Sequence, residues 1–173
     1  ISLVESGPAA GVIGAARVAE QLGEPNAVYL DIGGTTAKCS LILGGEPGTT
    51  TEYRIEWSPT FAGYPVMVPV VDIVEIGAGG GSIAWIDPET GLLKVGPQGA
   101  GAAPGPVCYD IGGSEPTVSD ADLVLGYLNE NYFLGGRMKL NKAKTLTAMR
   151  EKIAQPLKMS EVEAASGIYR IAN

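Results

Sequence analysis

The sequence predicts an α/β fold in which short strands meet at glycine-rich turns and helices flank them. Three observations predict this class: two apolar segments around a double glycine at residues 27–43, a helical pattern of small residues before them, and amphipathic helical patterns after residue 117. With 173 residues, of which 45% are hydrophobic and 18% charged, the chain can bury one sizeable core or two small lobes.

The first predicted elements are a short strand and a helix of small residues. Residues 1–5 form a short apolar strand candidate, and Pro8 suits the first turn of a helix over residues 9–22. Gly23 ends that helix, because glycine readily adopts the left-handed conformation that follows a helix C-terminus. Its alanines and glycines predict close packing in the core.

The double glycine of AVYLDIGGTTAKCSLIL joins predicted strands at residues 28–32 and 37–43. Adjacent Gly33 and Gly34 allow a tight turn with positive φ that exposes successive backbone N–H groups, and such a nest binds anions. Thr35 and Thr36 add hydroxyl donors. Asp31, at the end of an apolar strand, can hold Mg²⁺ directly or through water. The alternative is an ordinary β-hairpin with a glycine turn.

A second glycine-rich loop follows more strand-like sequence. Residues 51–57 alternate loosely as a strand, residues 61–69 form a loop or edge strand, and residues 68–76 are an apolar run. The sequence GAGGGS then includes Gly79, Gly80, Gly81 and Ser82 as candidate site residues. Its main chain must come close to something, which is either a bound phosphate or neighbouring backbone.

The remaining sequence predicts a hairpin and then helices. Residues 83–86 and 92–95 pair across a turn, and residues 96–106 form a packed irregular loop. A helix starts at residues 117–120, with Ser119 or Asp120 as its cap, and residues 141–153 are amphipathic. Ser160 and Glu163 have capping-box spacing before a last helix. We therefore predict a strand-rich phosphate-loop core at residues 1–128 and a helical segment at 129–173.

The charge balance and the cysteines limit the partners and the compartment. The chain has 12 Lys and Arg against 19 Asp and Glu, a formal charge of −7, so we expect no nucleic-acid partner. It contains no histidine, which removes the usual general base and the commonest zinc ligand. Cys39 and Cys108 lack Cys-x-x-Cys spacing, and no apolar run reaches membrane-spanning length. We expect a cytoplasmic protein without a membrane partner and, since it begins at Ile1, an internal piece of a longer chain.

Five sequence blocks in one order carry a family resemblance. They are SGPAAGV, DIGGTT, DIVEIGAGGGSIAWID, VGPQGAGAAPGPVCYDIGG and EPTVSDADLVLG, and they cover residues 3–128. This order resembles the hydantoinase A and oxoprolinase family, which includes N-methylhydantoinase A and subunits of ATP-dependent acetone and acetophenone carboxylases. The resemblance implies ATP-dependent hydrolysis of a cyclic amide of the hydantoin or oxoproline type, in which ATP phosphorylates the carbonyl oxygen. It also implies a second large subunit of the hydantoinase B type.

A broader likeness rests on the order of four elements, which are the small-residue helix, an apolar strand, the DIGGTT turn and a second strand. This order is similar to the second phosphate loop of actin, sugar kinases and heat-shock chaperone ATPases. That likeness implies a partial domain of ribonuclease-H-like, actin-like ATPase fold, with a mixed sheet, flanking helices and ATP between two lobes. It implies that Asp31 helps to place Mg²⁺ and that residues 33–36 line the phosphates. Lys38 is a further candidate for nucleotide contact.

Two departures from the family pattern bear on this expectation. Lys38 stands where family members often have an acid, and Val74 where they often have a histidine, so no role that needs an acid or a metal ligand there is expected. Asp72 is a candidate metal or substrate ligand, or else a carboxylate that caps the glycine loop. No catalytic residue is identified. The alternatives are a ketone carboxylase subunit, a nucleotide-gated binding module without turnover, and loops that are purely structural.

Overall fold

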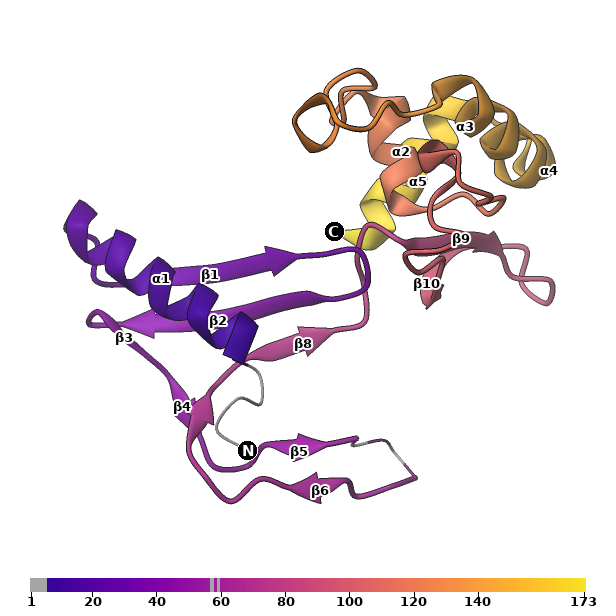
Figure 1. Ribbon diagram of the computed structural model, residues 1–173. Helices are drawn as coiled ribbons and strands as arrows, with labels where there is room; N and C mark the ends of the chain where they lie inside the picture. Colours follow the sequence, from indigo (N-terminus) through magenta and orange to yellow (C-terminus); the bar gives the residue numbers. More distant parts are fainter. Residues whose placement is uncertain (1–5, 57, 59) are drawn as a thin grey trace. The chain divides into compact units, whose positions relative to one another are not determined.

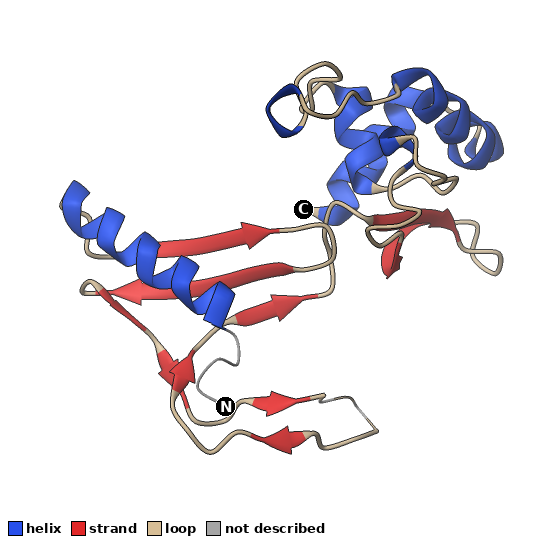
Figure 2. Cartoon of the chain, in the orientation of Figure 1, coloured by secondary structure: helices blue, strands red, loops and turns tan. Residues whose placement is uncertain are grey.

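The computed structural model describes residues 6–56, 58 and 60–173, and the chain divides into two compact units. The first unit takes in the described residues up to Asp31 together with Ala37–Ile76, and the second contains Ile32–Thr36 and Gly77–Asn173. The strand candidate at residues 1–5 lies outside the described residues. Figure 1 shows the element order and Figure 2 shows both helices and strands in each unit, which agrees with the predicted α/β class.

The first unit begins with α1 (Ser6–Leu22), which confirms the predicted small-residue helix. It is followed by Gly23, whose φ of +74° is in the left-handed region that glycine adopts without strain. Val12 and Ala16 of α1 pack with Ile42 in a buried cluster that also contacts Tyr29. One side of α1 therefore covers one face of the neighbouring sheet.

That sheet is built around β2 (Ala37–Leu43). It has the strand order β1 (Ala27–Ile32), β2 and β3 (Glu46–Pro47), and β8 (Val74–Ile76) also pairs with β2. The pairs of β2 with β3 and with β8 are antiparallel, and Figure 1 shows β1 and β2 running in opposite directions. Both strands predicted around the double glycine are thus confirmed, and Ser40 and Ile42 point to the buried side of β2.

Two short ribbons complete the first unit. β4 (Thr49–Thr50) pairs with β7 (Val70–Val71), and β5 (Arg54–Ile55) pairs with β6 (Tyr64–Pro65). The apolar run predicted at residues 68–76 is divided into β7 and β8, because Asp72 between them donates its N–H to the Gly48 carbonyl at 2.8 Å. Of the strand predicted at residues 51–57, Arg54–Ile55 form β5, and the Tyr53 carbonyl accepts a hydrogen bond from the Val66 N–H at 2.9 Å.

The second unit contains the predicted hairpin of β9 (Ser82–Ile86) and β10 (Leu93–Gly99). The two strands are antiparallel, with Ile86 opposite Leu93 and Ala84 opposite Val95. The second strand extends to Gly99, so the loop predicted from residue 96 begins later than expected. A 3-10 turn, η1 (Val107–Tyr109), follows that loop.

Helices form the rest of the second unit. They are α2 (Val118–Leu125), η2 (Leu134–Gly136), α3 (Lys142–Met149), the π-helical η3 (Arg150–Ala154), α4 (Gln155–Leu157) and α5 (Glu161–Ala172). Ala84 of β9 and Ala121 of α2 are buried with Met149, Ile153 and Ile168 in the main core cluster of this unit. The strands and helices of the second unit therefore share one core. In the part of the chain that the structure describes, no helix combines the length and apolar character needed to cross a membrane.

The helix caps are partly as predicted. Ser160 and Glu163 form the expected capping box at the start of α5. At α2 the cap is Thr117 rather than Ser119 or Asp120, because Thr117 has extended backbone angles while Asp120 already occupies the third helical position. The Asp120 side chain completes a second capping box with Thr117.

Asp87, in the turn between β9 and β10, gives the fold an acid-sensitive contact. Its carboxylate accepts hydrogen bonds from Lys94, at 2.5 Å, and from the Glu89 N–H, at 3.0 Å. The Lys94 hydrogen bond is the main cause that lowers the pKa of Asp87 from 3.8 to about 2. Because the folded state then binds fewer protons than the unfolded state, this contribution is complete above pH 3.8 and is lost as the pH falls toward 2.

We therefore expect Asp87→Asn to lower the melting temperature at pH 6 and to have a shrinking effect as the pH falls from 4 to 2. Thermal unfolding of both proteins across this pH range measures the difference. A difference in melting temperature between wild type and variant that stays constant down to pH 2 would show that the Asp87 carboxylate does not stabilise the fold in this way.

Candidate functional site

The loop between β1 and β2 is a tight turn whose glycines have open space beside them. The Gly33 N–H donates to the Thr36 carbonyl at 3.0 Å, which leaves Gly34 and Thr35 at the tip. Neither glycine has a positive φ, so the expected left-handed conformation is wrong for both. A Cβ atom added at Gly34 would meet nothing within 4 Å, and one at Gly33 would meet only the Thr36 oxygen at 3.7 Å. The fold itself therefore does not require glycine at either position.

The tip of this loop also presents backbone donors. Gly34 and Thr35 are exposed, and their N–H groups donate no hydrogen bond within the described residues. Exposed N–H groups on a turn attract anions, and the missing Cβ at Gly34 lets an anion come close to the main chain. This arrangement suits a phosphate group.

The second glycine loop packs against the first. Gly80 and Gly81 donate their N–H groups to the carbonyls of Gly33 and Gly34 at 2.9 and 2.7 Å. A Cβ atom on Gly79 would lie 2.7 Å from the Gly33 oxygen, and one on Gly81 would lie 2.7 Å from the Gly34 oxygen. Neighbouring backbone therefore explains why these glycines are needed, and their contact with a nucleotide stays a prediction.

Ser82 and Ser119 fix the second loop from its other sides. The buried Ser82 accepts a hydrogen bond at Oγ from the Gly79 N–H at 3.0 Å. The Ser119 N–H, at the start of α2, donates to the Gly80 carbonyl at 2.8 Å, and a Cβ at Gly80 would lie 2.6 Å from Ser119 Oγ. The loop is thus held between the hairpin tip and the first turn of α2.

Asp120 is the residue of this region whose role sequence reasoning missed. Its side chain is 1% exposed and accepts hydrogen bonds from the N–H groups of Val107, Cys108 and Thr117 at 3.1, 2.7 and 2.9 Å. The hydroxyls of Thr117 and Thr145 lie 2.8 and 3.2 Å from its oxygens. The sequence indicates Asp120 as a helix cap, but its bonds to η1 and α3 depend on contacts distant in the chain.

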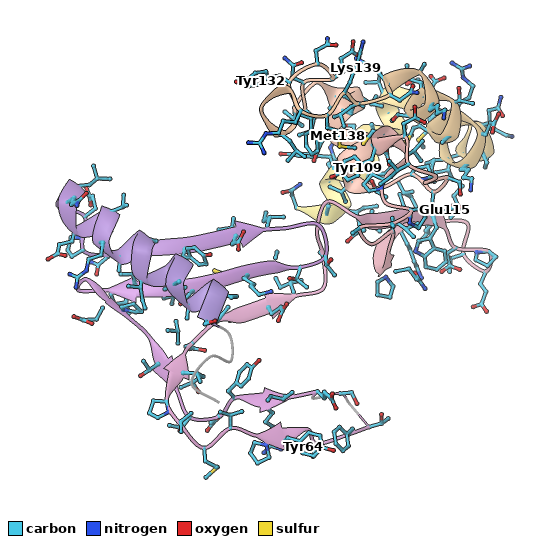
Figure 3. The ribbon with its side chains drawn as sticks, viewed as in Figure 1. Tyr64, Tyr109, Glu115, Tyr132, Met138 and Lys139 are labelled. Carbon is cyan, nitrogen blue, oxygen red and sulfur yellow. The ribbon has the colours of Figure 1, made fainter. Side chains whose placement is uncertain are left out.

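The cysteine and tyrosine next to this carboxylate have packing roles. Burial raises the pKa of the Cys108 thiol well above its usual range, so the thiol is not a nucleophile at neutral pH. Tyr109, labelled in Figure 3, packs on Phe133 with ring centroids 5.4 Å apart.

The predicted charged site residues of the first unit have different surroundings. Asp31 is exposed, and Tyr29 Oη donates to it at 3.4 Å. Lys38 forms an ion pair with Glu75 at 2.6 Å. Asp72 is exposed and makes main-chain hydrogen bonds, among them one from Ser40 Oγ to its carbonyl at 2.7 Å. Val74, on β8, is 60% exposed.

The donor set fits Mg²⁺ carried by a nucleotide better than Mg²⁺ held by the protein alone. Among residues 6–56, 58 and 60–173, no three Asp, Glu, Cys or His side chains are grouped so that they could hold a metal ion. Mg²⁺ commonly uses one or two carboxylates together with phosphate oxygens and water. Asp31 by itself can supply the one carboxylate that such an ion needs.

A groove of about 600 Å³ on the second unit has none of the predicted site residues among the described residues that line it. It lies between residues 110–114 and α3, and ion pairs of Lys144 with Asp110 and of Lys152 with Glu115 flank it.

Comparison with solved structures defines the class of domain. The chain superimposes on ATP-dependent caprolactamase from Pseudomonas jessenii with a TM-score of 0.80 and 42% identity over 96% of this chain and 23% of that one. It matches nucleotide-free acetone carboxylase with a TM-score of 0.78 and 39% identity, over 91% of this chain and 21% of that one. These matches confirm the predicted class, a partial α/β domain of the actin-like ATPase type.

The chain belongs to the hydantoinase/oxoprolinase family, whose model matches residues 1–173. It is 47% identical to the acetophenone carboxylase gamma subunit of Aromatoleum aromaticum over 96% of this chain and 22% of that protein. It is 42% identical to the caprolactamase alpha subunit of Pseudomonas jessenii over 100% of this chain and 24% of that protein. The chain thus spans less than a quarter of the length of these relatives.

Proposed function

We propose that this chain supplies the phosphate-binding hairpin of an ATP-dependent hydrolase that opens cyclic amides of the hydantoin or oxoproline type. The observation that carries the proposal is the hairpin tip, where Gly33 and Gly34 have no structural need to be glycine and leave the backbone open to an anion. The likeness to the ATP-dependent caprolactamase of Pseudomonas jessenii supports the choice of a cyclic amide as substrate.

In this mechanism the hairpin binds and orients the triphosphate. The N–H groups of Gly34 and Thr35 and the Thr35 hydroxyl would donate to phosphate oxygens, and Asp31 would hold the Mg²⁺ that the nucleotide brings. Mg²⁺, when bound, withdraws charge from the phosphates. Such preorganised donors stabilise the charge that develops during phosphoryl transfer, so the site needs no histidine.

The proposed reaction converts a poor electrophile into a good one. The amide carbonyl oxygen attacks the γ-phosphorus of ATP, and ADP leaves with the electrons of the broken P–O bond. Water then adds to the activated carbon, and the C–N bond of the ring breaks as the nitrogen takes up a proton from that water, which leaves an acyl phosphate. A second water hydrolyses the acyl phosphate to the carboxylate and inorganic phosphate. We place this reaction in the cytoplasm and in a complex with a second large subunit of the hydantoinase B type. Relatives of this chain are named as subunits, which supports a partner.

Phosphate release by the full-length protein with its partner subunit tests the proposal. We expect hydantoins or oxoproline to stimulate release from ATP, and Asp31→Ala to abolish the stimulation. Stimulation by a ketone with bicarbonate instead would favour the second candidate, a ketone carboxylase subunit, which the 47% identity to an acetophenone carboxylase subunit supports. Nucleotide binding without stimulation by any of these compounds would indicate a nucleotide-gated module.

The Gly34→Ala variant tests the hairpin itself. We expect the dissociation constant for MgATP to rise about tenfold or more, because the added methyl group occupies the space a phosphate needs. The melting temperature should stay unchanged, since that methyl group meets nothing within 4 Å of the fold.

Isothermal titration calorimetry and thermal unfolding of the full-length protein measure both quantities. Gly77→Ala is the matched control, because its added methyl group also meets nothing within 4 Å and should change neither value. Unchanged MgATP affinity in Gly34→Ala would rule out close phosphate approach at this position.

A further inference from the structure

Three charged residues form a row across neighbouring strands of the first unit. Lys38 on β2 is in register with Glu75 on β8, and their side chains form the 2.6 Å ion pair. On the other side, the bond from Gly33 N–H to the Thr36 carbonyl closes the hairpin. Because the two strands are antiparallel, the residues two positions before Gly33 and two positions after Thr36 face each other, and these are Asp31 and Lys38. Lys38 therefore has an acidic residue opposite it on each of the two neighbouring strands.

Electrostatic effects at Tyr29 agree with this placement. Burial raises the pKa of Tyr29, the charge of Asp31 raises it further, and the charge of Lys38 opposes the rise. Both charges therefore act on the same hydroxyl, which donates to Asp31 at 3.4 Å. The charges of Asp31 and Lys38 thus both reach the Tyr29 hydroxyl.

α1 limits the movement of Tyr29. A Cβ atom on Gly11 would lie 2.2 Å from Tyr29 Oη, so glycine at this position makes room for the hydroxyl. The hydroxyl is thus confined between the helix backbone and Asp31.

Lys38 is more enclosed than an ordinary surface lysine. Its side chain is 17% exposed, whereas that of Glu75 is 46% exposed. A lysine side chain has many rotamers, and fixing its ammonium in one place before a ligand arrives removes an entropic cost from binding. Glu75 supplies this constraint through the strand register.

We propose that Glu75 is a positioning residue, which holds the Lys38 ammonium beside Asp31 so that the protein supplies its own cation to the phosphates of the nucleotide. This inference rests on the proposed function. It adds Lys38 to the groups that contact the phosphates. Glu75 affects nucleotide binding only by holding Lys38 in place.

The test is a double-mutant cycle in the full-length protein with Lys38→Gln, Glu75→Gln and both together. Titration calorimetry measures the dissociation constant for ADP without Mg²⁺ and for MgATP, and thermal unfolding measures stability. We expect Lys38→Gln to weaken ADP binding about tenfold and Glu75→Gln to weaken it about threefold. The double variant should match Lys38→Gln, because Glu75 has nothing to position once the lysine is gone.

Two controls separate this role from a structural one. Glu75→Asp keeps the charge and should recover part of the affinity lost in Glu75→Gln. Lys152→Gln breaks a comparable ion pair with Glu115 on the second unit and should leave nucleotide affinity unchanged.

The outcomes distinguish the inference from the function on which it rests. Failure of the wild-type protein to bind either nucleotide would refute the proposed function and the inference together. Wild-type binding that Lys38→Gln leaves intact, or additive losses in the double variant, would refute the inference alone.

Discussion

Replacing Asp120 with alanine is expected to lower the free energy of unfolding by about 3 to 5 kcal/mol. The carboxylate is buried and accepts three backbone N–H groups, from Val107, Cys108 and Thr117, as well as two threonine hydroxyls. Alanine would leave these donors inside the protein without an acceptor, and an unsatisfied buried donor costs its full desolvation penalty. The free energy of unfolding of Asp120→Asn should lie between those of the wild type and Asp120→Ala, because one oxygen is kept while the amide nitrogen faces other donors.

Asp122 provides the matched control for this prediction. It lies on the same helix, and burial raises the pKa of its carboxyl, which shows that the environment disfavours its charge. Asp122→Ala should therefore leave stability unchanged or slightly raise it. Urea unfolding of the full-length protein, followed by circular dichroism, compares the three variants. A loss below about 1 kcal/mol for Asp120→Ala would show that water replaces the carboxylate.

The role of Asp120 illustrates what local sequence signals contain and what they omit. α1, the β1–β2 hairpin, the β9–β10 hairpin and the capping box at Ser160 were predictable, since each depends on residues close in sequence. The bonds from Asp120 to Cys108 and Thr145 join segments 12 and 25 residues away. No spacing rule predicts such contacts.

The candidate site shows the same limit. The sequence placed both glycine-rich stretches in the candidate site but left open whether a phosphate or neighbouring backbone fills the space beside them. The structure gives open space at Gly34 and backbone contact at Gly79 and Gly81. The pairing of Lys38 with Glu75 was also missed, because it depends on the register of β2 with β8. The sequence alone does not show whether a glycine makes room for a ligand or for neighbouring backbone, because that depends on its tertiary neighbours.

The Gly81→Ala and Gly79→Ala variants are expected to destabilise the protein by about 2 to 3 kcal/mol each. In both, the added methyl group lies 2.7 Å from a carbonyl oxygen of the β1–β2 hairpin. That oxygen cannot move away without breaking the hydrogen bond from Gly80 or Gly81 that joins the two loops. Thermal and urea unfolding of the full-length protein measure the loss, and Gly77→Ala again serves as the control.

The same variants connect the second loop to the proposed function. Because the hairpin tip must shift to admit a methyl group at Gly81, MgATP binding should weaken together with stability. Gly34→Ala should weaken binding alone. If Gly81→Ala instead weakened binding while stability stayed at the wild-type value, the second loop would touch the nucleotide directly, and its glycines would serve the ligand rather than the packing of one loop on the other.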